Sequence, residues 1–232
     1  MIILKLILAH LIGDFFLQPN SWVASKERDK LKSPYLYLHV FIHFCLMNLL
    51  LMDASLWSIA AIVAVTHFII DVSKLYFQTI KTKRAWFFVD QFLHFAVIAI
   101  IGLWLGEINL NLLSDTAVLK YSVAALFLTL PSSYIIRNLL ASWTPFSQNQ
   151  NDIQTDSLTN AGKYIGILER LLVFVFIAVN HWEGVGFMIA AKSVFRFSDL
   201  AQAKQRKLTE YVLVGTLLSF GLAIITGILI NL

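Results

Sequence analysis

Long apolar stretches alternate with short polar connections along the chain. A helix needs about 20 apolar residues to cross the hydrocarbon core of a bilayer. Stretches near this length occur at residues 2–17, 36–52, 56–73, 86–106, 117–136, 164–180, 184–197 and 210–231. The stretch at 184–197 is short for a crossing and indicates a tilted or broken helix among neighbours. The pattern predicts an all-α, polytopic transmembrane helix bundle with seven or eight membrane segments, one of them short or broken.

The composition agrees with this fold class. Of the 232 residues, 58% are hydrophobic and 14% are charged, and a soluble domain of this length could not bury so much apolar surface. Cys45 is the only cysteine, which excludes an intrachain disulfide and a thiolate metal site. The net charge of +4 lies in short loops, and we find no nucleic-acid motif. We therefore expect the lipid bilayer as partner and no nucleic acid, with the oligomeric state open.

Basic residues gather in alternate connections, at 18–35, 74–85, 137–163 and 196–209. The opposite loops carry only acidic charges, at Asp53, Glu107, Asp115 and Glu183. The positive-inside rule then predicts cytoplasmic basic loops and both termini outside. The polar segment 145–161 predicts a flexible cytoplasmic linker. It would separate an N-terminal bundle of four or five helices at 1–144 from C-terminal membrane helices at 162–232.

Four apolar stretches carry pairs of ionisable residues spaced four apart. The pairs are His10/Asp14, His39/His43, His67/Asp71 and Asp90/His94. Charge inside a bilayer is costly and persists only where it is paired, ligated or lining a pathway. The spacing places both members of a pair on one helix face. In the predicted orientation all pairs lie near the cytoplasmic helix ends, in two layers about 6 Å apart, which predicts one shared polar core.

Imidazole and carboxylate groups in the core of a helix bundle commonly bind metal ions. We predict a divalent metal site, with zinc favoured and iron or manganese as options. The predicted ligands are His10, Asp14, His43, His67, Asp71, Asp90 and His94. His39 is either a further ligand or a proton shuttle. These groups suffice for two ions, or for one ion with Asp–His pairs that fix each imidazole tautomer.

The alternative for any single pair is structural. A membrane histidine often only bonds a neighbouring helix, and Asp14 or Asp90 could pair with Lys74 or Arg84. The occurrence of four pairs at matched depth favours a metal or proton site over this alternative.

The second half carries further charges within predicted spans, in GILERLL and AAKSVFRF. We predict that Arg170, Lys192 and Arg196, helped by Ser193, bind an anionic group such as phosphate. Glu169 is a candidate general base or extra ligand. The structural alternative is snorkelling of these side chains to the interface, with an ion pair between Glu169 and Lys192 or Arg196.

Several motifs of the chain resemble a bacterial integral-membrane family known as domain of unknown function 3307. They are HLIGDFFLQP, HFIID, DQFLH, IGILER, AAKSVFRF and EYVLVGTLLS. The resemblance spans nearly the whole chain and implies an integral membrane protein with no established activity. Together with the loop charges, it predicts a multi-pass protein of the bacterial cytoplasmic membrane. The HxxxD pattern is also similar to membrane-bound metal-dependent hydrolases and to the transport site of cation-diffusion zinc carriers.

Three functions remain open from the sequence. We favour a metal-dependent hydrolase that acts on a lipid or another amphiphilic, anionic substrate, because a bound metal ion activates water. The second is a divalent-cation or proton-coupled transporter, which is disfavoured because we find no inverted repeat and no matching acidic residue in the outer half of the first four spans. The third is a structural or signalling membrane subunit whose polar core only orders the bundle.

Overall fold

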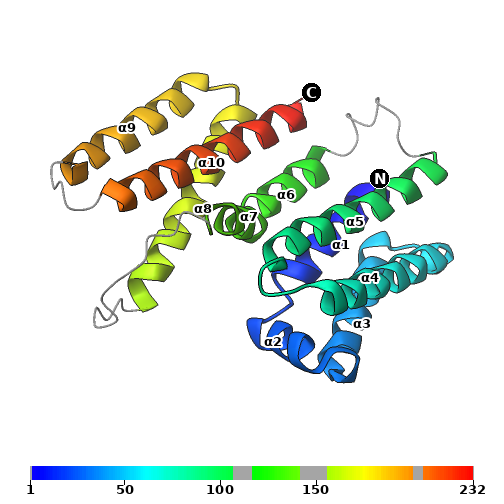
Figure 1. Ribbon diagram of the computed structural model, residues 1–232. Helices are drawn as coiled ribbons and strands as arrows, with labels where there is room; N and C mark the ends of the chain where they lie inside the picture. The colour runs from blue at the N-terminus through cyan, green and yellow to red at the C-terminus, as the bar shows by residue number, and fades with distance from the viewer. Residues whose placement is uncertain (1, 107–116, 142–155, 201–205, 232) are drawn as a thin grey trace. The chain divides into compact units, whose positions relative to one another are not determined.

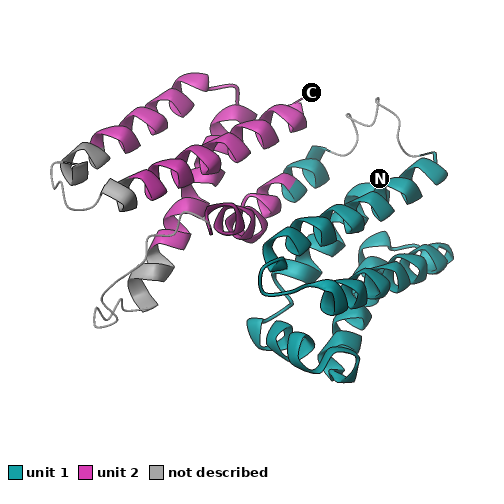
Figure 2. Cartoon of the chain, viewed as in Figure 1, with its two compact units in different colours: residues 1–123 teal, residues 124–232 magenta. Residues whose placement is uncertain are grey.

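The computed structural model describes residues 2–106, 117–141, 156–200 and 206–231, and within these ranges the side chains of 156–161, 195–200 and 206–209 fall outside the description. The described residues form helices and contain no strand, which confirms the predicted all-α class. Figure 1 shows the helices in chain order. Two compact units divide the chain, residues 1–123 and residues 124–232 (Figure 2).

Four helices form the frame of the first unit: α1 (Ile2–Phe15), α3 (Pro34–Leu51), α4 (Trp57–Phe77) and α5 (Lys83–Trp104). Helix α1 packs against α3 and α5, and α4 packs against the same two helices (Figure 1). These contacts close a four-helix bundle. Pro34 stands in the first turn of α3, where a missing N–H leaves no hydrogen bond unmade. Met52 ends α3 in the left-handed conformation, which turns the chain toward α4.

The first apolar segment is bent rather than straight. Helix α1 has 14 residues and extends about 21 Å, less than the roughly 30 Å of a bilayer core. After Pro19 the chain continues as α2 (Asn20–Asp29), at 81° to α1. Helix α2 is polar and contacts α3, yet its Lys26 is buried. The chain after α1 therefore turns back onto the bundle.

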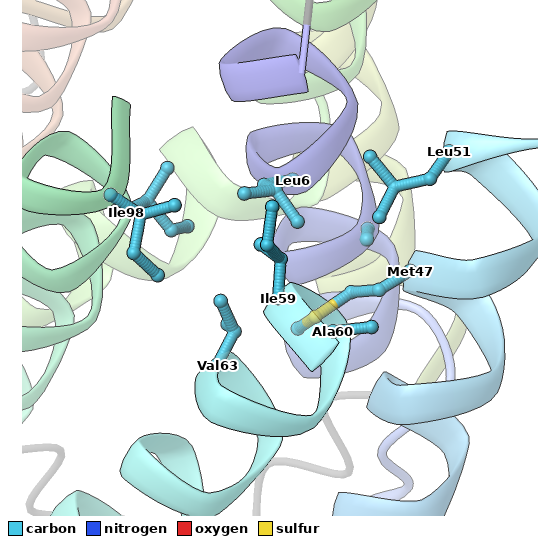
Figure 3. Close-up of a cluster of buried hydrophobic side chains, with 9 residues drawn as sticks. Leu6, Met47, Leu51, Ile59, Ala60, Val63 and Ile98 are labelled. Atoms are coloured by element: carbon cyan, nitrogen blue, oxygen red, sulfur yellow. The ribbon is translucent and has the colours of Figure 1, made fainter. Parts of the chain in front are cut away.

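Apolar side chains from all four frame helices close one end of the bundle. This apolar cluster consists of Leu6, Ala9, Met47, Leu51, Ile59, Ala60, Val63, Ile98 and Ile101 (Figure 3). In α1 and α4 these residues precede the histidines, and in α3 and α5 they follow them. The apolar cluster thus lies on one side of the histidines, where its closely packed side chains hold the four helices together.

The second unit contains α7 (Leu130–Leu140), α8 (Asp156–Ala178), α9 (Trp182–Leu200) and α10 (Arg206–Asn231), and α6 (Ala117–Phe127) leads into it. Helix α8 packs against α7, α9 and α10. Helices α8 and α10 approach closely at Gly227, where a Cβ atom would lie only 2.8 Å from Cγ2 of Ile177. Glycine has no side chain, and this allows the two helices to come so close.

In the part of the chain that the structure describes, five helical segments are long and apolar enough to cross a membrane: Pro34–Leu51, Ala54–Phe77, Lys83–Trp104, Ala117–Leu140 and Glu210–Asn231. The bent pair of α1 and α2 raises the number to six if it forms one span. The predicted count of seven or eight segments is therefore not confirmed, because the segments at 164–180 and 184–197 are not among those found. The loop 107–116 and most of the linker at 145–161 lie outside the described residues, so the predicted domain division stays a prediction.

Candidate metal centre

Five histidines and three aspartates from α1, α3, α4 and α5 meet in the core of the first unit. They are His10, His39, His43, His67, His94, Asp14, Asp71 and Asp90, the eight residues that the spacing pattern placed in one core. Each of these histidines is at most 3% exposed. The ring of His67 stacks between those of His43 and His94, with centroids 4.0 Å from each. Since i, i+4 spacing holds each pair on one helix face, the closed bundle turns all four faces inward.

Asp14 connects three of the histidines. Its Oδ1 atom lies 3.0 Å from Nε2 of His43, 3.3 Å from Nε2 of His39 and 3.6 Å from Nε2 of His67. The Nε2 atoms of His39 and His67 are 3.1 Å apart. Donor atoms around a tetrahedral zinc ion, with bonds of 2.0–2.1 Å, lie about 3.3 Å from one another. These donors therefore have spacings that suit a tetrahedral metal ion.

A second set of donors lies around His94. Its Nε2 atom is 3.5 Å from Oδ1 of Asp90 and 3.7 Å from Oδ1 of Asp71. Neither Nε2 of His94 nor Oδ1 of Asp90 has a hydrogen-bond partner among the described residues, although both atoms are buried. Buried polar atoms are normally satisfied, so a donor pair without partners fits a site that binds a ligand.

Within the described ranges, three overlapping groups of residues present donor atoms within 4.8 Å of one another. They are His10 with Asp14, His43 and His67; His39 with His67 and Asp71; and Asp14 with Asp90 and His94. His67 and Asp14 each belong to two groups, so neighbouring ions could share them. Mixed imidazole and carboxylate ligands suit zinc, iron or manganese. The arrangement can hold one or two divalent ions.

Two of the three aspartates form ion pairs with lysines. Nζ of Lys74 donates to Oδ2 of Asp90 at 2.8 Å, which is one of the structural pairings considered from the sequence. Nζ of Lys26 donates to Oδ2 of Asp71 at 2.9 Å, and sequence reasoning missed this contact because it assigned Lys26 to a basic loop. The sequence did contain a signal for this contact, because Lys26 lies on the same side of the short helix at 20–29 as Trp22 and Val23.

Gln91 was also missed. Its Nε2 atom donates to Oδ2 of Asp14 at 2.9 Å, and its Oε1 atom lies 3.3 Å from Nε2 of His10. Such contacts fix the orientation of metal ligands. The signal was present in the sequence, because Gln91 is an amide inside an apolar span, three residues before His94 and so on the same helix face.

The cluster opens into a small pocket of about 40 Å³. Its charged wall consists of Asp14, Lys26, Glu27, Asp71, Lys74 and Asp90. A water molecule needs roughly 10–15 Å³ by this measure, so the pocket can hold water. It lies where α1 and α4 end and α5 begins, at the opposite end of the histidine cluster from the apolar cluster.

A family described as "Protein of unknown function (DUF3307)" matches residues 2–123. The chain belongs to this family. The DUF3307 match has nearly the bounds of the first unit and contains the whole histidine–aspartate cluster. It is narrower than the resemblance seen in the sequence, since IGILER, AAKSVFRF and EYVLVGTLLS lie beyond it. No curated protein and no solved structure matches the chain.

Arg170, a predicted anion-binding residue, lies beyond the DUF3307 match and is buried in the second unit. Its Nε atom donates to the carbonyl of Leu128 at 2.6 Å, and Nη2 donates to the carbonyl of Thr129 at 3.0 Å. Further bonds reach the hydroxyls of Ser133 at 2.6 Å and Ser219 at 3.2 Å. The guanidinium therefore satisfies carbonyls at the break between α6 and α7.

The other residues predicted in the second half also lie beyond the DUF3307 match. Lys192 forms an ion pair with Glu169, as the structural alternative expected. The hydroxyl of Ser193 donates to the carbonyl of Ile189 in its own helix. The side chain of Arg196 is outside the described part. The predicted roles of these residues in anion binding and base catalysis stay predictions.

Proposed function

We propose that this protein is a metal-dependent hydrolase of the bacterial cytoplasmic membrane that acts on a lipid or another amphiphilic, anionic substrate. One observation carries the proposal. Eight imidazole and carboxylate side chains from four helices converge in a buried cluster whose donors have metal-ligand spacing. Ionisable groups at this depth are costly to keep unless they have a function.

The closed end of the bundle favours hydrolysis over transport. A transporter needs access to its ion site from both sides of the membrane. Here the apolar cluster fills the space between the frame helices on one side of the histidines, and the pocket opens on the other. A site reached from one side suits a reaction whose substrate arrives and whose products leave by the same route.

The residues of the cluster have different roles in the proposed reaction. A bound divalent ion would polarise the scissile group and lower the pKa of a water molecule. His43, His67 and Asp14 would hold the ion, and Gln91 orients Asp14 through its amide. Nε2 of His39 lies 3.3 Å from Oδ1 of Asp14, and its Nδ1 atom has no hydrogen-bond partner among the residues that the structure describes. It serves either as a further ligand or as the group that carries a proton toward the pocket.

The membrane arrangement belongs to the same proposal. The basic connections at 18–35 and 74–85 adjoin the open end of the cluster, so the positive-inside rule puts the pocket on the cytoplasmic face. Both termini then lie outside, as the alternation of loop charges predicts. Helices α8 and α9 supply the segments that bring the count to seven or eight, with α9 as the short or broken one.

Purified full-length protein in detergent tests the proposal. We expect stoichiometric zinc, iron or manganese by elemental analysis, and release of phosphate or of octanoate from dioctanoyl phosphatidic acid. His67→Ala and Asp71→Ala should both lose metal and activity. His181→Ala is the matched control, because this histidine is exposed in the second unit.

Each outcome separates one reading from the others. Full activity in either His67→Ala or Asp71→Ala would reject the assignment. Metal flux into proteoliposomes that Asp14→Ala abolishes would indicate transport instead. Absence of stoichiometric metal, with no loss of activity in the histidine variants, would favour the structural or signalling subunit.

A further inference from the structure

Two lysines from different helices face the pocket beside the metal-ligand cluster. Lys26 comes from α2 and Lys74 from α4, and their side chains are 7% and 26% exposed. Burial of an ammonium group is unfavourable unless a partner compensates it. Each lysine has such a partner, because Lys26 pairs with Asp71 and Lys74 pairs with Asp90.

Metal binding would change the negative charge that these lysines compensate. Asp14, Asp71 and Asp90 carry three negative charges and the two lysines carry two positive charges, so with neutral histidines the cluster holds one negative charge. One divalent ion on the carboxylates reverses the sign to one positive charge, and a second ion adds two more. Carboxylates that bind a metal ion are weaker partners for ammonium groups, which then present excess positive charge to the pocket.

The remaining charge of the pocket wall does not alter this balance. Glu27 also lines the pocket, but it forms an ion pair with Lys83, whose Nζ atom is 2.5 Å from Oε1 of Glu27. Gln78 contributes a buried Oε1 atom that has no hydrogen-bond partner among the described residues. Because an amide can present oxygen or NH₂ to a ligand, Gln78 can bond either a hydroxyl or an anionic oxygen.

We propose that Lys26 and Lys74 bind a phosphate-type anionic group of the substrate in this pocket, next to the metal centre. The inference rests on the proposed function and adds its substrate class, a phosphate ester. Metal ions and lysines on one anionic group are a recurrent way to bind phosphate. The pocket adjoins the predicted cytoplasmic interface, where the headgroup of an amphiphile would arrive, whereas its apolar chain would remain in the bilayer.

Equilibrium dialysis of the zinc-loaded full chain with radiolabelled inorganic phosphate tests the proposal. We expect phosphate to bind the zinc-loaded protein and to bind the chelator-treated protein at least tenfold more weakly. The double variant Lys26→Gln/Lys74→Gln should keep its zinc, since removing two ammonium groups relieves competition for the carboxylates. Its affinity for phosphate should fall at least tenfold.

The control variant Lys32→Gln/Lys81→Gln removes the same charge from exposed lysines outside the pocket wall and should bind phosphate normally. Competition separates the two sources of phosphate: dihexanoyl phosphatidic acid should displace the label more strongly than glycerol phosphate if the ligand is a lipid headgroup. The reverse order would identify a soluble phosphate ester.

Failure of this inference differs from failure of the proposed function. Zinc-loaded protein that does not bind phosphate, or equal binding by both double variants, would overturn the phosphate site and leave the metal centre intact. Protein without stoichiometric metal would overturn both. Phosphate binding without hydrolysis of dioctanoyl phosphatidic acid would uphold the site and reject the enzyme.

Discussion

The imidazole of His43 lies directly over the backbone of Gly13, so close that a Cβ atom there would be 2.3 Å from Nε2 of His43. Gly13 immediately precedes Asp14, whose Oδ1 atom is 3.0 Å from the same Nε2 atom. A glycine at this position lets a side chain of α3 cross over α1 to reach a carboxylate on it. The sequence motif HLIGD thus contains the space that the His43 ring occupies as well as two of the predicted ligands, His10 and Asp14.

We predict that Gly13→Ala lowers the affinity for zinc by about 10–100-fold, the effect usual for changes that reorient metal ligands. Real Cβ contacts do not approach 2.3 Å, so the His43 ring must move away from Asp14. Competition with a chromogenic chelator measures the affinity. Gly186→Ala is the matched control, because a Cβ atom at that helical glycine meets nothing within 4 Å. Equal zinc affinity in Gly13→Ala and wild-type protein would contradict the proposed ligand set.

The apolar cluster leads to a prediction about stability. Leu6 is 0% exposed within the cluster, whereas Leu49 is 65% exposed. We expect Leu6→Ala to lower the free energy of unfolding by about 2–5 kcal/mol through the cavity that it leaves. Leu49→Ala should leave it within about 0.5 kcal/mol. Unfolding in mixed micelles by denaturing detergent measures both, and similar losses in the two variants would mean that Leu6 does not pack between the frame helices.

The sequence predicted the frame of the first unit because the pattern is local. The apolar stretches at 36–52, 56–73 and 86–106 correspond to α3, α4 and α5 within a few residues at each end. The bend after α1 was not predicted, although Pro19 and the polar residues after it mark the break. The stretches at 164–180 and 184–197 were counted as membrane segments on their apolar content alone. Neither is among the described helices that are long and apolar enough to cross a membrane.

The cluster itself was predictable because helical periodicity fixes the face of each pair and burial cost favours a shared interior. The contacts of the two lysines and of Gln91 were not predicted. Lys26, for example, reaches Asp71 only because α2 folds back across the end of the bundle. For Arg170, the sequence suggested a role but did not reveal the contacts. Its charge suggested an anion site, but its partners are carbonyls exposed by a helix break that no local pattern revealed.

The proposed cytoplasmic position of the pocket predicts from which side of the membrane a cysteine in the pocket can be labelled. In a Cys45→Ala background, Gln78→Cys should react with a membrane-impermeant maleimide in inverted vesicles and stay unlabelled in intact spheroplasts, because Gln78 lines the pocket on the basic-loop side. Met52→Cys, 83% exposed at the far end of α3, should show the reverse pattern. Labelling of Gln78→Cys from outside would overturn the cytoplasmic orientation of the site.

A substitution of Arg170 distinguishes a structural role of this residue from a role in substrate binding. Arg170→Met removes hydrogen bonds to the carbonyls of Leu128 and Thr129 and leaves them without their donor. We expect a loss of roughly 3 kcal/mol in the free energy of unfolding, since bonds from a charged donor contribute about 1.5–3 kcal/mol each, with zinc content unchanged. Arg137→Met, at an exposed position of α7, should change stability little. Wild-type stability in Arg170→Met together with weakened phosphate binding would instead assign Arg170 to the anion site that the sequence suggested, because a residue that only completes a helix break cannot be removed without cost to the fold.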